Sequence, residues 1–125
     1  MNAFASIRDT RFDASAAREG GDIVVRFRGN AEMNAERYLP DFLAAVHGAA
    51  VREQVTHVRV DLTELAFMNS SCFKDFIVWL EKVRESPGDR QYQVAFLSSA
   101  KQHWQRRSLQ ALSCFAKDHV TILPS

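Results

Sequence analysis

A run of small polar residues follows an apolar stretch in the middle of the chain and opens a second, strongly apolar one. It consists of Ser70, Ser71 and Cys72, directly after Asn69. Hydroxyl groups at a strand-to-helix junction lie beside the free backbone N–H groups of the helix, which favour negative charge, including a phosphate. The run therefore predicts a place where a phosphoserine sits or where a partner protein docks.

Each of these residues also has a purely structural interpretation. Asn69 or Ser70 is the natural N-cap of the helix, and capping is worth ~1 kcal/mol without any further function. Ser71 is expected to point into the junction. Cys72 acts as a nucleophile only with a stabilised thiolate and a nearby base, and no Cys–His–Asn arrangement is assignable. Packing is favoured for Cys72, because free cysteine is among the most buried residue types.

The other residues capable of catalysis are scattered along the chain. Asp61 and Glu64 have the chemistry for acid–base work, but an acid at the end of a strand, like Asp61, commonly accepts hydrogen bonds from loop N–H groups. No metal-ligand spacing relates the histidines, which are His47, His57, His103 and His119. We therefore predict no catalytic residue, no metal and no cofactor.

Two surface interpretations remain open in the second half of the chain. Lys101, Arg106 and Arg107 surround Trp104, a combination that can bind single-stranded nucleic acid by stacking and phosphate contact. A net charge of +1 argues against a nucleic-acid partner, so we expect none, with Trp104 in the core and the charges on a solvated face. A separate apolar excess on the preceding helix, from Val78 and Trp79, marks either a partner surface or burial under the third helix.

The elements that position these residues alternate between strands and helices. Five strands are expected at 11–17, 23–28, 57–62, 92–97 and 119–123, and three helices at 31–50, 71–85 and 100–115. The first strand is expected at a sheet edge, and Gly29 with Asn30 is expected to end the second. Pro40 either kinks the first helix or marks its start near Leu39. Ser98 or Ser99 is expected to cap the third.

This order predicts an α/β domain with a mixed sheet of about five strands and helices packed mainly on one face. One domain is expected over residues 1–125, with residues 1–10 loose or forming an extra turn. The chain is 46% hydrophobic and 25% charged, with two cysteines and no apolar run of the ~18 residues that a membrane span needs. We expect a cytoplasmic protein with no membrane insertion and no signal peptide.

The run from Val60 to Cys72 reads V-D-L-T-E-L-A-F-M-N-S-S-C. It resembles the signature of STAS domains, which occur in sulphate transporter tails and in anti-sigma factor antagonists, and most of all that of the small single-domain bacterial antagonists. Their motif reads Asp-Ser-Ser-Gly, so Asn69 stands at the usual Asp and Cys72 at the usual Gly. Residues 29–32, G-N-A-E, lie where such domains have a G-x-x-[DE] turn.

The resemblance implies a regulatory protein–protein interaction module that switches partners in signal transduction, and not an enzyme. It implies phosphorylation at Ser70 by a partner, which is a kinase-type anti-sigma factor or another histidine-kinase-like ATPase domain. The implied partner-binding residues are Phe67, Met68, Asn69, Ser70, Ser71, Cys72 and Phe73. A weak homodimer stays open.

Two alternatives remain. In the first, the chain is a non-switching STAS-like subunit of a larger regulatory or transport assembly, and Asn69 and Cys72 mark the loss of phosphorylation. Otherwise it is a small enzyme that depends on Cys72.

Overall fold

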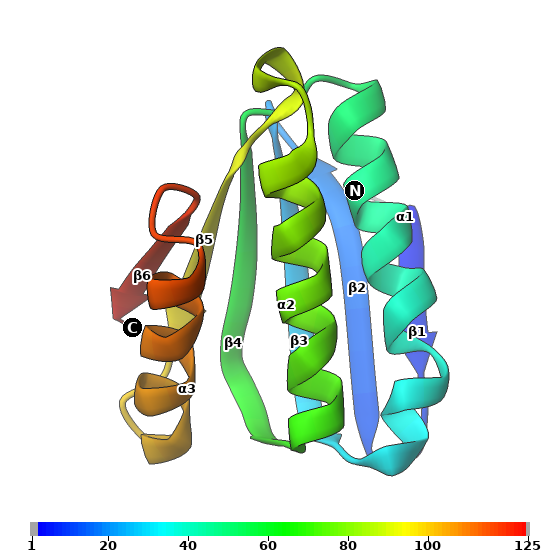
Figure 1. Ribbon diagram of the computed structural model, residues 1–125. Coiled ribbons are helices and arrows are strands. Elements are labelled where there is room, and N and C mark those ends of the chain that lie inside the picture. Colours follow the sequence, from blue (N-terminus) through cyan, green and yellow to red (C-terminus); the bar gives the residue numbers. More distant parts are fainter. Residues whose placement is uncertain (1–2, 125) are drawn as a thin grey trace.

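A computed structural model describes residues 3–124 (Figure 1). Its strands are β1 (Ala5–Arg8), β2 (Phe12–Glu19), β3 (Asp22–Ala31), β4 (His57–Met68), β5 (Gln93–Ser98) and β6 (Val120–Pro124). Its α-helices are α1 (Leu39–Arg52), α2 (Ser70–Glu85) and α3 (His103–Phe115), and its short 3₁₀ helices are η1 (Met33–Arg37) and η2 (Gly88–Arg90).

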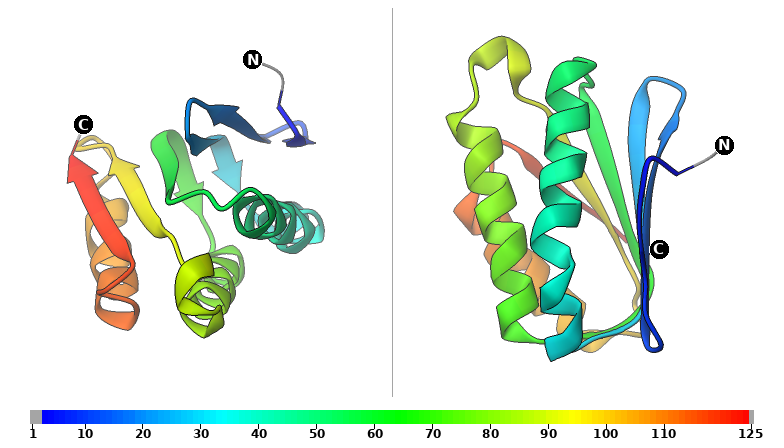
Figure 2. Two further views of the ribbon diagram at one scale, coloured as in Figure 1. Left: turned by 90° about the horizontal axis from the view of Figure 1, so that it is seen from above. Right: turned by 90° about the vertical axis from the view of Figure 1, so that its right-hand side faces the viewer.

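The strands form one six-stranded sheet in which spatial order follows chain order from β1 to β6. The strands β1, β2 and β3 pair antiparallel, whereas β3, β4, β5 and β6 pair parallel. Every crossover from β3 onward moves one strand further in the same direction, and right-handed crossovers then place all helices on one side. Figure 2 shows α1, α2 and α3 on the same face of the sheet. The predicted mixed sheet with helices mainly on one face is confirmed.

The N-terminal segment corrects two predictions. Residues 5–8 form β1, which pairs along the whole of its length with β2, and Ile7 is only 5% exposed. The sheet thus has six strands and not about five, and β2 is an interior strand and not an edge. The weak sequence pattern of β1 reflects its place at the sheet edge, where only Ile7 is buried. Met1 and Asn2, also within the segment predicted to be loose, lie outside the described residues.

The prediction that Gly29 and Asn30 end their strand is wrong, because β3 continues to Ala31. Gly29 has a φ of +92°, and a Cβ atom there would lie 2.1 Å from the carbonyl oxygen of Arg11. The same oxygen accepts a hydrogen bond of 2.7 Å from the Asn30 N–H. Glycine here lets β2 approach β3 closely without ending the strand.

We expect Gly29→Ala to lower the free energy of unfolding by more than about 2 kcal/mol, because it adds a backbone collision to the strain of a positive φ. The matched control is Gly48→Ala in α1, where an added Cβ meets nothing within 4 Å. That change is expected to stabilise the protein by roughly 0.5–1 kcal/mol, since alanine favours a helix over glycine. Urea denaturation measures both, and equal effects of the two variants would contradict this account of Gly29.

The strand predicted at residues 57–62 is also longer than expected. It runs to Met68, because it keeps its parallel pairing with β3 as far as Ala31 opposite Met68. Its pairing with β5 stops earlier, at Asp61 opposite Leu97. Register shifts along the β3 ladder mark bulges in β4. At one of them, the Asp61 carboxylate accepts hydrogen bonds from the Thr63 N–H and hydroxyl at 2.9 and 2.7 Å.

The helices match prediction in place and differ at their ends. Of the two options for Pro40, the helix start is correct, because α1 begins at Leu39 with the proline in its first turn. Helix α3 begins at His103 with Gln102 as its N-cap, so neither Ser98 nor Ser99 caps it.

The core lies between the sheet and the helices. The Phe27 ring of β3 meets Phe42 of α1 and Phe76 of α2 edge-on, with centroids 5.8 and 5.7 Å apart. Phe76 meets Phe96 of β5 in the same way at 5.7 Å. Edge-to-face pairs add about 0.5–1.5 kcal/mol each beyond area burial, so this cluster fixes α1 and α2 over the centre of the sheet.

The apolar excess on α2 divides into two parts. Trp79 is 2% exposed, and its indole N–H donates to the Tyr92 hydroxyl at 2.9 Å, which also lies 2.7 Å from Nδ1 of His47 in α1. Helix α1, and not the third helix, therefore covers Trp79. Val78 remains 53% exposed.

Residues 3–124 contain neither a membrane-spanning helix nor a cluster of metal-binding side chains. None of the helices there combines the length and the apolar character that crossing a membrane takes. In the same range, no group of three or more His, Cys, Asp or Glu side chains is placed to hold a metal ion.

Candidate functional site

The junction between β4 and α2 is built by Asn69. Its side-chain oxygen accepts a hydrogen bond of 2.9 Å from the Cys72 N–H, which makes it the N-cap of α2. Its own N–H donates to the carbonyl of Ala31, at the end of β3, at 2.9 Å. Of the two residues predicted as caps, the structure selects Asn69, so the Ser70 hydroxyl does not make the capping bond.

Ser70 is the first residue of α2 and is exposed. The first turn of the helix contains no acidic residue, and exposed Lys74 follows one turn later. A phosphate on Ser70 would lie at the positive end of the helix dipole with no nearby carboxylate in the same turn. The site can therefore carry a phosphoserine in the free protein without strain on the helix.

The predicted partner-binding residues fall into two groups. Phe67 is 44% exposed, and Ser70 is exposed beside it, whereas Asn69, Ser71 and Phe73 are half-buried. The other two, Met68 and Cys72, are buried at 8% and 0% exposure. Surface contact is thus open to Phe67 and Ser70 above all, and Met68 and Cys72 support them from below.

Sequence reasoning missed an exposed apolar residue next to this junction. Met33, at the start of η1, is 71% exposed. Met33 falls within the helix expected at 31–50, but the structure places it in η1, ahead of the start of α1 at Leu39. The end of β3 pairs with the end of β4, Asn30 opposite Phe67, so η1 and the start of α2 meet at one end of the molecule (Figure 1). We call Met33, Phe67 and Ser70 the junction surface.

Cys72 sits beneath the junction surface as a neutral thiol. Its sulfur donates to the carbonyl of Glu32 at 3.4 Å. Burial, with the negative charges of Glu36 and Asp75, raises the pKa of Cys72 to about 12. A thiol in this environment is a poor nucleophile at neutral pH, which agrees with the packing role predicted for it.

Helix α3 supports the junction from the other side. Gln105 is 0% exposed, and its side-chain N–H groups donate to the carbonyls of Leu62 and Leu65 at 2.8 and 2.9 Å. The Trp104 indole N–H donates to the carbonyl of Ala66 at 2.8 Å. These carbonyls lie in the part of β4 beyond its pairing with β5. The bonds from α3 satisfy them and fix the strand that leads to Phe67.

Trp104, at the centre of the patch predicted from the sequence, therefore has a structural role, because its indole N–H binds the backbone of β4. Lys101, Arg106 and Arg107 are exposed around it.

The sequence itself matches neither a family model nor, significantly, a curated protein. Its fold is similar to an anti-sigma factor antagonist from Mycobacterium paratuberculosis, with a TM-score of 0.63 at 16% identity over 91% of this chain and 86% of that one. It is also similar to the anti-sigma factor antagonist SpoIIAA in its unphosphorylated form, with a TM-score of 0.57 at 17% identity over 90% and 87% of the two chains.

At these identities the likeness concerns the fold. The chain has the fold of the anti-sigma factor antagonists, and the predicted STAS-like fold is confirmed.

Proposed function

We propose that this protein is a regulatory interaction module of the anti-sigma factor antagonist type, which binds its partner through the junction surface and is switched by phosphorylation of Ser70. The observation that carries the proposal is the exposure of Ser70 as the first residue of α2 in a STAS-like fold. The proposed partner is a kinase-type anti-sigma factor or another histidine-kinase-like ATPase domain.

The proposed switch is electrostatic. Unmodified Ser70 presents a small neutral hydroxyl on the same surface as the exposed Phe67 and Met33 side chains. Phosphorylation adds about −1.5 to −2 charges and three acceptor oxygens. In the free protein, solvent and the N-terminus of α2 stabilise this charge, whereas a packed apolar contact would strip its water away. Phosphorylation therefore weakens docking without refolding the domain and releases the partner.

The structure favours this proposal over an enzyme that uses Cys72. The thiol is fully buried, its pKa is raised to about 12, and its neighbours Glu36 and Asp75 add negative charge and no cationic partner. Asn69 and Cys72 still favour a second candidate, a non-switching subunit of a larger assembly. Phosphate uptake by Ser70 separates these two.

Site-specific photo-crosslinking in the native cell tests the docking surface. A photoreactive phenylalanine analogue in place of Phe67 is expected to capture a kinase-fold ATPase, because this side chain lies beside Ser70. The matched control carries the analogue at Leu123 in β6, an exposed apolar residue of a strand that does not border the junction. Equal capture of the same protein from both positions, or from Leu123 alone, would contradict docking at the junction surface.

A further inference from the structure

Two acidic side chains meet beneath the junction surface, and neither forms a salt bridge within residues 3–124. Glu36 belongs to η1, and Asp75 lies in the second turn of α2, within hydrogen-bonding reach of Glu36. One oxygen of each, Oε2 of Glu36 and Oδ2 of Asp75, is buried and has no hydrogen-bond partner among the described residues. The pair therefore links η1 to α2, two elements that are far apart in the sequence.

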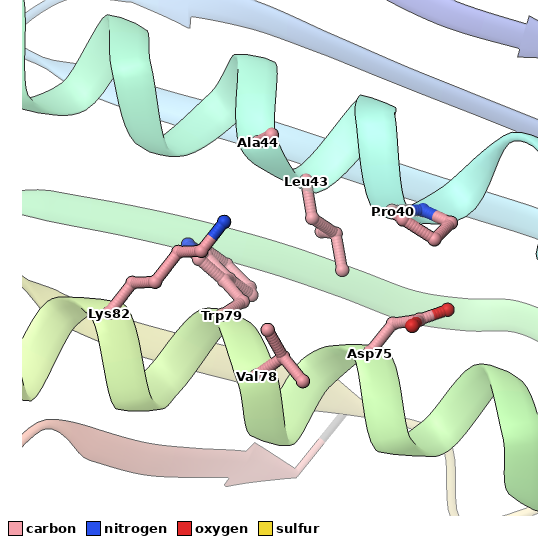
Figure 3. A pocket seen from close by; sticks show the side chains of 7 residues that line it. All are labelled: Pro40, Leu43, Ala44, Asp75, Val78, Trp79 and Lys82. Atoms are coloured by element: carbon pink, nitrogen blue, oxygen red, sulfur yellow. The ribbon is translucent and has the colours of Figure 1, made fainter.

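The groups that face this pair do not neutralise it. Helix α1 contributes Pro40 and Leu43, which are uncharged and line a small hollow of about 60 Å³ beside Asp75. Figure 3 shows the Asp75 carboxyl directed toward Pro40 at the start of α1, while Lys82 reaches the same hollow about two turns further along α2. From α2 itself comes Cys72, whose neutral thiol interacts with both acids.

Two carboxylates this close cannot both be ionised cheaply, because their charges repel and their facing oxygens are both acceptors. A single proton removes both problems, since it turns one oxygen into a donor for the other. Burial, followed by the contact with Glu36, raises the pKa of Asp75 to about 7. At neutral pH, the Asp75 carboxyl is therefore close to half-protonated.

We propose that Glu36 and Asp75 hold one proton between them, and that this shared proton fixes η1 against α2, so that its loss frees η1. Because η1 carries Met33, the pair then couples proton concentration to the shape of the junction surface. That consequence for partner binding rests on the proposed function, whereas the shared proton does not.

The coupling has a defined sign. The pKa of Asp75 is higher in the folded than in the unfolded chain, so this pair's contribution to stability is complete below about pH 4 and is lost as the pH rises through about 7. His47 acts in the opposite direction, because burial and then Lys82 lower its pKa. The two effects overlap, so the pair is measured by comparison with variants and not from the wild-type pH profile alone.

The test is an NMR titration of the full chain from about pH 5 to about pH 9, with carboxyl carbon shifts and amide hydrogen exchange as readouts. In the wild type, Asp75 is expected to titrate near pH 7. Protection of the Ala35 and Tyr38 amides, which close η1 by hydrogen bonds, should fall by at least about tenfold across that midpoint, after correction for intrinsic exchange.

Asp75→Asn keeps a donor for Glu36 but removes the titration, so η1 should stay protected at all pH values. Glu36→Gln should do the same from the other side. The matched control is Glu81→Gln, which removes an exposed acid of the same helix and should leave the pH dependence of η1 protection as in the wild type.

Titration of Asp75 near pH 4, or loss of η1 protection with the same midpoint in Asp75→Asn, would overturn the proposal. Neither result would affect the role of Ser70, which is measured separately by partner affinity.

Discussion

Replacing Gln105 with leucine is expected to lower the free energy of unfolding by about 4 kcal/mol, since each buried backbone group left unpaired costs about 1–3 kcal/mol. The change removes both donors to the carbonyls of Leu62 and Leu65, and also the acceptor of the Ser99 N–H at 2.9 Å. Leucine has nearly the volume of glutamine, so cavity formation contributes little. Urea denaturation of the two proteins measures the difference.

Gln110→Leu is the matched control for Gln105→Leu. It makes the same chemical change on an exposed position of the same helix, where substitutions usually remain within about 0.5 kcal/mol. If both variants were equally stable, the carbonyls of β4 would have other partners, and the support of the junction by α3 would be wrong. Hydrogen exchange at Phe67 and Asn69 should rise in the Gln105 variant alone, because their strand then loses its attachment to α3.

The burial of Gln105 could be predicted from the sequence, but its hydrogen-bond partners could not. Gln105, Leu109 and Leu112 follow the spacing i, i+4 and i+7, so the periodicity already places the glutamine on the buried face of α3. Its partners are invisible in the sequence, because they are carbonyls exposed by bulges in β4 and by the early end of the β5 pairing. The signal available in the sequence was Gln105 itself, a polar residue within the apolar stripe of a helix.

The parts of the fold that could be predicted are those with strong local patterns. The central strands around Val25 and Val60, and the helix that buries Phe76, follow from period-two and helical spacing. Strand β1 and the extension of β3 past Gly29 depend on contacts with distant segments, here with β2 and with the Arg11 carbonyl. Such tertiary pairing overrides local propensity.

The candidate site divides in the same way. Helix-start chemistry placed Ser70 at a junction, and the structure confirms that it begins α2 and is exposed. Met33 joined the surface only through the pairing of β3 with β4, and the Glu36–Asp75 pair only through the packing of η1 on α2. Neighbours of this kind come from topology and cannot be derived from spacing along the chain.

Ser70→Asp is expected to weaken partner binding by a few kcal/mol, or roughly a hundredfold or more, if the contact is desolvated, because a buried charge without a partner is costly. The fold should be unchanged. Asn69 makes the capping bond, and an acid in the first turn of a helix is mildly stabilising. Ser70→Ala removes the phosphate acceptor but adds no charge, so it should bind as the wild type does and take up no phosphate.

Asn69→Asp restores the acid of the family motif and keeps the cap, since Asp and Asn are equally good N-caps. If that acid helps the kinase to recognise or phosphorylate the serine, this variant should take up phosphate faster than the wild type, with an unchanged thermal midpoint. A rate equal to that of the wild type would show that Asn69 is no obstacle to phosphorylation.

The most direct test of the central claim compares the partner affinities of the wild type and Ser70→Asp. The partner identified by crosslinking is purified separately, and its affinity for each protein is measured by calorimetry. Phosphate uptake and thermal melts are measured on the same samples. The account predicts tight binding and phosphate uptake by the wild type, and a large loss of affinity for Ser70→Asp at equal thermal stability. Equal affinities, with no phosphate uptake by any form that contains Ser70, would contradict it and make the protein a constitutive interaction module.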